Sequence, residues 1–105
     1  MSRARVDLAV VGSVNVDLVA SVARLPLPGE TVAALGFAQF VGGKGGNQAV
    51  AAARLGRHVA LVGLTGDDAE GGVVRAALAA EGVDVAHLGV APTTATGRAI
   101  VVVAE

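Results

Sequence analysis

The sequence contains no cysteine, tryptophan or tyrosine, and its only aromatic residues are Phe37 and Phe40. Without cysteine the chain can form no disulfide, no thiolate metal site and no cysteine nucleophile. The scarcity of aromatic rings leaves little for nucleic-acid bases to stack on. Eight basic and nine acidic residues give a formal net charge of −1, so no positive field attracts a phosphate backbone. Nucleic acid is therefore not expected as a partner.

Long apolar runs are also absent. The apolar run that follows residues 1–5 is interrupted first by Asp7 and then by Asn15, inside what would be the apolar region of a signal peptide. No apolar stretch approaches the ~20 residues that a helix needs to span a bilayer. We therefore expect a cytoplasmic protein with no membrane partner.

Hydrophobic residues make up 53% of the 105 residues, which predicts a folded domain. Short β-branched runs alternate with alanine-rich stretches, and the order β-β-β-α-β-α-β-β predicts an α/β fold with buried parallel strands. The expected strands are 6–12, 17–23, 31–41, 59–64, 83–90 and 97–105. The expected helices are 47–55 and the stretch between Asp68 and Gly82.

The last expected strand, 97–105, runs to the final residue of the sequence. Nothing follows it to cover its edge or its apolar side chains. One interpretation is a small complete domain whose last strand pairs at a sheet edge. The other, which we favour, is the front portion of a longer chain, because so few crossover units leave apolar area exposed.

Polar residues follow the first expected strand, in the segment Gly12-Ser13-Val14-Asn15-Val16-Asp17. In an open α/β sheet, ligands gather at the carboxyl ends of strands. If the segment is extended, Asn15 and Asp17 point to the same side. A carboxylate beside a carboxamide can hold neighbouring hydroxyls, which suits a neutral polyol. The alternative is an ordinary turn.

A second motif, Gly42-Gly43-Lys44-Gly45-Gly46-Asn47-Gln48, leads into the first expected helix. Glycines allow a backbone to approach a ligand closely, and a helix N-terminus offers unpaired N–H groups. The motif matches neither a Walker loop, which needs Ser or Thr after the lysine, nor the pattern G-x-G-x-x-G. If the helix begins by Lys44, then Lys44, Asn47 and Gln48 share one face. The alternative is a flexible loop with a solvated lysine.

The remaining polar residues carry weaker signals. Asp67 and Asp68 are typical of helix caps. His58 and His87 have neither a carboxylate nor a second histidine near them in sequence, so no metal site is expected there. Arg98 is expected to face solvent on its strand.

Four segments in succession resemble the front part of the ribokinase-like family of carbohydrate kinases. They are Val-Val-Gly-Ser-Val-Asn-Val-Asp, Pro-Leu-Pro-Gly-Glu-Thr, Gly-Gly-Lys-Gly-Gly-Asn-Gln-Ala and Gly-Leu-Thr-Gly-Asp-Asp. The resemblance implies a Rossmann-like α/β core with a small β-sheet lid, and ATP-dependent phosphorylation of D-ribose at its 5-hydroxyl. Residues 1–105 would be the N-terminal sugar-binding part, with lid segments at about 17–41 and 97–105.

The resemblance also implies a set of substrate-binding residues: Asn15, Asp17, Gly43, Lys44 and Asn47, with Ala99 as a lid contact. It implies no catalytic residue here, because the family's Gly-Ala-Gly-Asp motif, which holds the catalytic base, is absent from the sequence. The sites for ATP, Mg²⁺ and a monovalent cation (K⁺) would lie with that motif, and no metal ligand is expected here. The 105-residue piece alone is expected to be inactive.

Two further expectations concern partners. The resemblance implies a homodimer through the lid in the full-length protein, and the small-molecule partner is ribose, a related pentose or a nucleoside. The alternative function is a stand-alone, non-catalytic module that binds sugar or dimerises through the lid.

Overall fold

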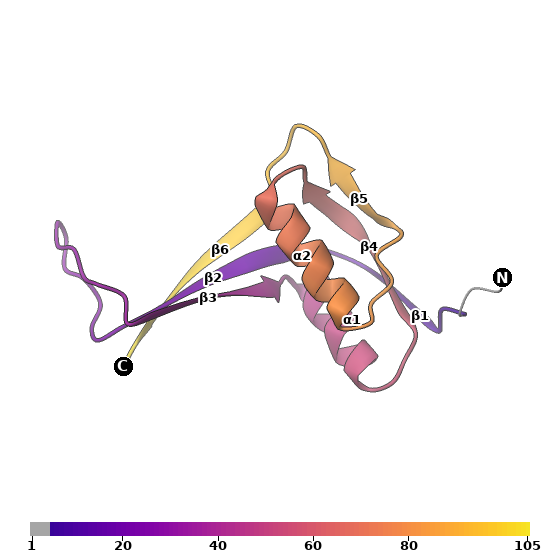
Figure 1. Cartoon of the computed structure of the whole chain (residues 1–105), viewed down its shortest axis with the longest axis horizontal. Coiled ribbons are helices and arrows are strands. Elements are labelled where there is room, and N and C mark those ends of the chain that lie inside the picture. Colours follow the sequence, from indigo (N-terminus) through magenta and orange to yellow (C-terminus); the bar gives the residue numbers. More distant parts are fainter. Residues whose placement is uncertain (1–4) are drawn as a thin grey trace.

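The computed structural model describes residues 5–105. Residues 1–4, where the segment considered as a signal peptide begins, lie outside the described part. The elements follow the predicted order (Figure 1). They are β1 (Leu8–Val11), β2 (Asn15–Val22), β3 (Gly36–Gly42), α1 (Lys44–Arg54), β4 (Val59–Gly66), α2 (Ala69–Ala80), β5 (Leu88–Ala91) and β6 (Gly97–Ala104).

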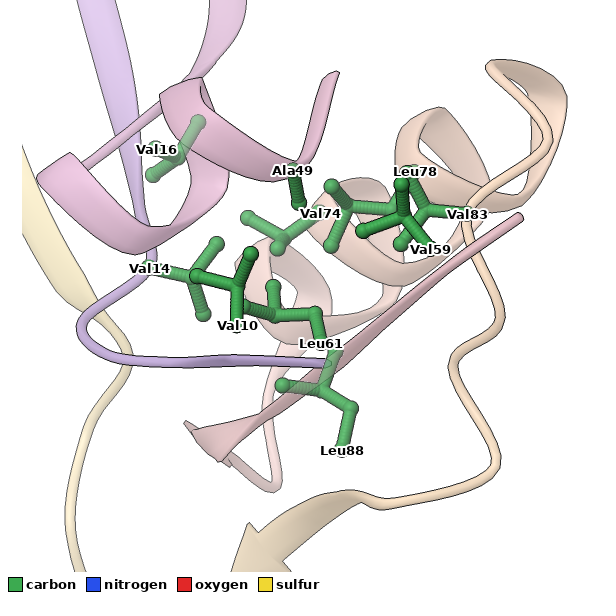
Figure 2. Close-up of a cluster of buried hydrophobic side chains, with 10 residues drawn as sticks. All are labelled: Val10, Val14, Val16, Ala49, Val59, Leu61, Val74, Leu78, Val83 and Leu88. Atoms are coloured by element: carbon green, nitrogen blue, oxygen red, sulfur yellow. The ribbon is translucent and has the colours of Figure 1, made fainter. Parts of the chain in front are cut away.

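Three of the strands form a parallel sheet in the order β1-β4-β5, which we call the core sheet. Both helices pack on one face of it, where Leu61 of β4 and Leu78 of α2 are fully buried. Side chains from strands and helices meet there in one apolar cluster (Figure 2). Each such buried leucine or valine contributes about 1.5–3 kcal/mol to folding, so this cluster holds the helices on the sheet.

The opposite face of the core sheet carries no helix in the described chain. Val11 of β1 is 79% exposed and Leu64 of β4 is 65% exposed. A hollow of about 650 Å³ lies beside them and also reaches Ser13, His87 and Gly89. This face therefore exposes apolar side chains, as expected for a sheet with so few crossover units.

The other three strands form a second sheet in the order β3-β2-β6, which we call the outer sheet. β3 runs antiparallel to β2, and β6 runs parallel to it. The outer sheet extends away from the core as an arm that ends in the loop at residues 23–35 (Figure 1). The radius of gyration is 16.1 Å, against about 13 Å for a compact domain of this length, because the arm packs against the core only at its base.

Several boundaries differ from the predictions. The third strand begins at Gly36 rather than at residue 31, because its partner β2 ends at Val22 and leaves nothing for residues 31–34 to pair with. Helix α1 begins at Lys44 rather than at Asn47, although glycine disfavours helix. Tertiary packing overrides that preference, since Gly45 lies directly against the backbone of Gly12.

The remaining differences are smaller. The second strand begins at Asn15, two residues earlier than predicted. In place of a continuous strand over 83–90, Asp84 forms one isolated bridge with Ala60 and β5 covers only Leu88–Ala91. The predicted cap is confirmed, because Asp68 is the N-cap of α2 and accepts a hydrogen bond from the Gly71 backbone N–H at 2.9 Å. In the described part of the chain, neither helix is long and apolar enough to cross a membrane.

Candidate functional site

The candidate site lies where the two sheets meet. The chain passes from β1 into β2 through residues 12–14, and from β3 into α1 through Gly43. Asn15 is the first residue of β2, and Asp17 is paired with Phe40 on one side and Ala99 on the other. Because residues two apart in a strand share a face, Asn15 and Asp17 lie on the same face of the outer sheet. The predicted same-side geometry is confirmed.

Asn15 and Asp17 are directly connected. The Asn15 Nδ2 group donates a hydrogen bond to Asp17 Oδ1 at 3.0 Å, and both residues are half-buried. Within residues 5–105, the second carboxylate oxygen of Asp17 accepts no side-chain or backbone hydrogen bond. An ionised carboxylate offers about four acceptor sites, so the pair keeps most of its capacity for hydroxyl groups of a ligand.

Two glycines give the pair its space. A Cβ on Gly42 would collide with the Asp17 carboxylate, and a Cβ on Gly43 would lie 2.8 Å from Asn15 Oδ1. Gly43 also has φ +85° and ψ 148°, a conformation that is essentially restricted to glycine. Gly43 was among the predicted residues, whereas Gly42 was missed. Its signal is the strand register, which places it opposite Asn15 and is not visible in the sequence.

Lys44 and Asn47 lie in the first turn of α1, and both are exposed. The helix begins early enough to place them on one face, as the sequence argument required. The Asn47 backbone N–H donates to the Gly43 carbonyl at 2.9 Å, which continues the helix from the glycine turn. In the described chain no hydrogen bond joins the Lys44 or Asn47 side chain to Asp17. These two residues are near the Asn15–Asp17 pair along the chain and form no hydrogen bond to it within residues 5–105.

Ala99 of β6 pairs with Asp17 in register and is half-buried. Its methyl group lies on the face that carries the carboxylate, and it adds no polar group there. The predicted substrate residues therefore fall into two groups. Asn15, Asp17, Gly43 and Ala99 are brought together, and Lys44 and Asn47 stand at the helix start.

A second polar cluster, which the sequence did not indicate, joins α2 to β6. Asp68 accepts hydrogen bonds from the Thr96 backbone N–H at 2.9 Å and from its hydroxyl at 2.5 Å. The Thr96 side-chain hydrogen bond, with help from the Thr96 and Gly71 backbone N–H groups, lowers the pKa of Asp68 below its ordinary value. The aspartate therefore stays ionised to a lower pH than an aspartate without these hydrogen bonds.

Arg98 belongs to the same cluster, and it is exposed as expected, with 41% of its side chain accessible. Its Nη2 atom lies 3.1 Å from Glu70 Oε2 and 3.6 Å from Asp68 Oδ2. Hydrogen bonding to Arg98 is the main reason why the pKa of Glu70 is lowered. No sequence signal could have found this cluster, because Thr96 and Asp68 are 28 residues apart and meet only through the strand order.

Among residues 5–105, no three His, Cys, Asp or Glu side chains gather as a metal site would require. The ring Nδ1 of His58 lies 3.0 Å from the Arg5 carbonyl oxygen, and no second metal-ligating side chain joins it in the described part of the chain. The described residues therefore bring together no set of ligands that fits Mg²⁺.

A family model described as pfkB family carbohydrate kinase matches residues 6–105. The chain is 44% identical over 101 residues to a ribokinase of Haemophilus influenzae and 43% identical over 99 residues to one of Bacillus subtilis. These matches cover 96% and 94% of the chain, but only 33% and 34% of the relatives.

Solved structures agree in fold. A structure of Arabidopsis thaliana ribokinase complexed with ribose and ATP superposes with a TM-score of 0.80 at 38% identity. That match covers 90% of the chain and 31% of the Arabidopsis protein. The predicted α/β core with a second, small sheet is thereby confirmed. The chain spans about one third of the length of the relatives it matches.

Proposed function

Because the chain belongs to the pfkB family of carbohydrate kinases, we propose that it is the N-terminal, sugar-binding portion of a kinase that phosphorylates D-ribose. The outer sheet, built from the segments expected at about 17–41 and 97–105, would be the lid over the sugar. The product would be D-ribose 5-phosphate, and the protein would act in the cytoplasm.

The observation that carries this proposal is the Asn15–Asp17 pair on the face opened by Gly42 and Gly43. The pair presents a carboxylate and a carboxamide side by side, 3.0 Å apart at their joined atoms. A carboxylate accepts from two neighbouring hydroxyls, and a carboxamide both donates and accepts, which matches the vicinal hydroxyls of a pentose. The similarity to a ribokinase that binds ribose and ATP supports the same substrate class.

In the proposed enzyme these residues bind and orient the sugar. Asp17 and Asn15 would hold ring hydroxyls, Lys44 and Asn47 would reach the sugar from the helix start, and Ala99 would close over its apolar side. ATP supplies the phosphoryl group when bound. We propose that its site, the sites for Mg²⁺ and K⁺ and the catalytic base lie in a later part of the kinase. Among residues 5–105, no three His, Cys, Asp or Glu side chains come together to hold a metal ion.

A kinase assay tests this proposal. The complete gene product, expressed from its native start codon to its native stop codon, is expected to form ADP from ATP when ribose is added with Mg²⁺ and K⁺. The 105-residue chain alone is expected to form none, because positioning of the nucleotide and a base are both needed for phosphoryl transfer. Bacillus subtilis ribokinase, assayed in parallel, is the positive control.

The outcomes separate the parts of the proposal. Ribose-dependent ADP formation by the 105-residue chain would place the base within it and overturn the assignment of the catalytic part. If the complete product used 2-deoxyribose or adenosine much faster than ribose, the proposed substrate would be wrong. If it used none of these, the proposed function would be wrong.

We also propose that the complete protein is a homodimer joined through the outer sheet. Ile100 on β6 is 79% exposed and Phe37 on β3 is 62% exposed, and apolar groups this exposed favour association. Sedimentation equilibrium is expected to give twice the monomer mass, and Ile100→Asp to give the monomer mass. Leu55→Asp, at a residue of similar exposure outside the outer sheet (81%), is the control and is expected to remain dimeric. A monomeric wild type, or a dimeric Ile100→Asp variant, would contradict the assignment.

A further inference from the structure

Strand β6 of the outer sheet is attached to the rest of the molecule through Thr96. β6 follows the loop at residues 92–96, and Thr96, its last residue, is only 3% exposed. The Thr96 hydroxyl donates to Asp68 Oδ1 at 2.5 Å and accepts from the Gly66 backbone N–H at 2.8 Å. Its own backbone N–H donates to Asp68 Oδ2 at 2.9 Å. Every hydrogen-bonding group of the Thr96 side chain is therefore used within the protein.

The polar groups of the cluster are joined to one another. Asp68 Oδ1 also accepts from the Gly71 backbone N–H at 2.9 Å. A Cβ on Gly71 would lie 3.1 Å from Thr96 Oγ1 and would collide with the Gly66 carbonyl oxygen. Both carboxylate oxygens and the hydroxyl thus have partners within the protein, and hydrogen bonds to an ionised carboxylate are the stronger kind. These features are those of a rigid joint rather than of a binding site.

The residues that follow Thr96 border the candidate sugar site. Gly97 pairs with Asn15, and a Cβ on Gly97 would lie 3.2 Å from the Asn15 Cβ. Two residues further along, Ala99 pairs with Asp17 on the same face. Because side chains alternate along a strand, Gly97 and Ala99 lie on the face that borders both predicted sugar-binding side chains. Thr96 directly precedes Gly97, so its position determines where β6 lies beside them.

Arg98 secures the opposite face of the same strand. It lies between Gly97 and Ala99, and its guanidinium is paired with Glu70 at 3.1 Å on the first turn of α2. The beginning of β6 is therefore held from behind by α2, while its other face borders Asn15 and Asp17. The joint fixes the strand without itself reaching the sugar face.

We propose that Thr96 and Asp68 are positioning residues that hold β6 in the conformation able to bind sugar. This inference rests on the proposed function, because it assigns the joint to the same sugar site. Loosening the joint lowers the fraction of molecules whose outer sheet is ready to bind, and the apparent affinity falls by that fraction. Once sugar is bound the strand is in place again, so turnover is affected little.

The test compares Thr96→Val with Thr96→Ser in the complete gene product. Valine has the shape of threonine but lacks the hydroxyl, so the Gly66 N–H loses its acceptor and Asp68 loses a donor. We expect KM for ribose to rise about tenfold, as a competent fraction of about one tenth would give, with kcat within about twofold of wild type. Serine keeps the hydroxyl, so Thr96→Ser is expected to have a KM for ribose within about twofold of wild type.

Leu78→Val is the control for a general loss of stability. Leu78 is fully buried in α2 among the apolar cluster and makes no contact in the joint. It is expected to lower stability while leaving KM for ribose unchanged. An unchanged KM in Thr96→Val, a failure of serine to restore it, or an equal rise in Leu78→Val would overturn the proposal.

Hydrogen exchange without ligand provides the second readout. We expect Thr96→Val to accelerate exchange at the amides of β6 by at least about tenfold while those of β4 keep their wild-type rates, since local opening is measured separately from global unfolding. Leu78→Val is expected not to show this selectivity. If the wild type fails to phosphorylate ribose, the proposed function is wrong, and the exchange rates alone decide whether the joint holds β6.

Discussion

Replacing Asp17 by asparagine is expected to lower kcat/KM for ribose by about 100-fold or more. The change keeps the shape of the side chain. Asn15 Nδ2, which donates to Asp17 Oδ1 at 3.0 Å in the wild type, can still donate to the amide oxygen of the new side chain. It removes the charge and turns one acceptor into a donor. Two hydrogen bonds from sugar hydroxyls to a charged acceptor contribute about 1.5–3 kcal/mol each, and 1.4 kcal/mol corresponds to tenfold.

Asp67→Asn is the matched control. Asp67 is exposed, makes no hydrogen bond or ion pair within residues 5–105, and lies on the loop before α2. The same chemical change there is expected to leave kcat/KM within about twofold of wild type. Steady-state kinetics with ribose and with ATP as the varied substrate measure both variants. If Asp17→Asn retained wild-type kcat/KM, the assignment of the Asn15–Asp17 face to the sugar would fail.

The fold could be predicted from sequence because local and long-range signals agree in it. Asp68 before an alanine-rich stretch and Gly82 after it indicated α2, and the structure places a cap and a φ of +83° there. β-branched runs likewise indicated the buried strands, because their local preference for extended structure agrees with the burial of these strands in the sheet. The boundary errors arose where tertiary contacts oppose local preference, as at Gly45, which is helical because it packs against Gly12.

The candidate site was predictable only in part. Asn15 and Asp17 were recognised because two-residue spacing in an extended chain puts side chains on one face. Ala99 was placed at the site by resemblance alone, and the strand register now sets it beside Asp17. The joint at Thr96 was not predictable, since a buried threonine and a capping aspartate are ordinary residues until the strand order brings them together.

Replacing Gly43 by alanine is expected to lower the free energy of unfolding of the complete gene product by about 4 kcal/mol. The φ of +85° costs a residue with a Cβ about 1–3 kcal/mol. The new methyl group would also lie 2.8 Å from the Ser13 carbonyl oxygen and from Asn15 Oδ1, and overpacking of this kind costs about 1–3 kcal/mol. Urea unfolding followed by circular dichroism measures the loss.

Gly56→Ala is the control for a positive φ without a close approach, because Gly56 has φ +88° and nothing lies within 4 Å of the position of its Cβ. It is expected to lose only about 1 kcal/mol, the cost of the left-handed backbone alone. The difference between the two variants then measures the close approach to Ser13 and Asn15 together with the extra backbone cost of ψ 148° at Gly43. Equal losses would mean that this approach relaxes without cost and that Gly43 serves only the turn. A larger loss in Gly43→Ala, together with a raised KM for ribose, would show that the turn and the polar pair are built against each other.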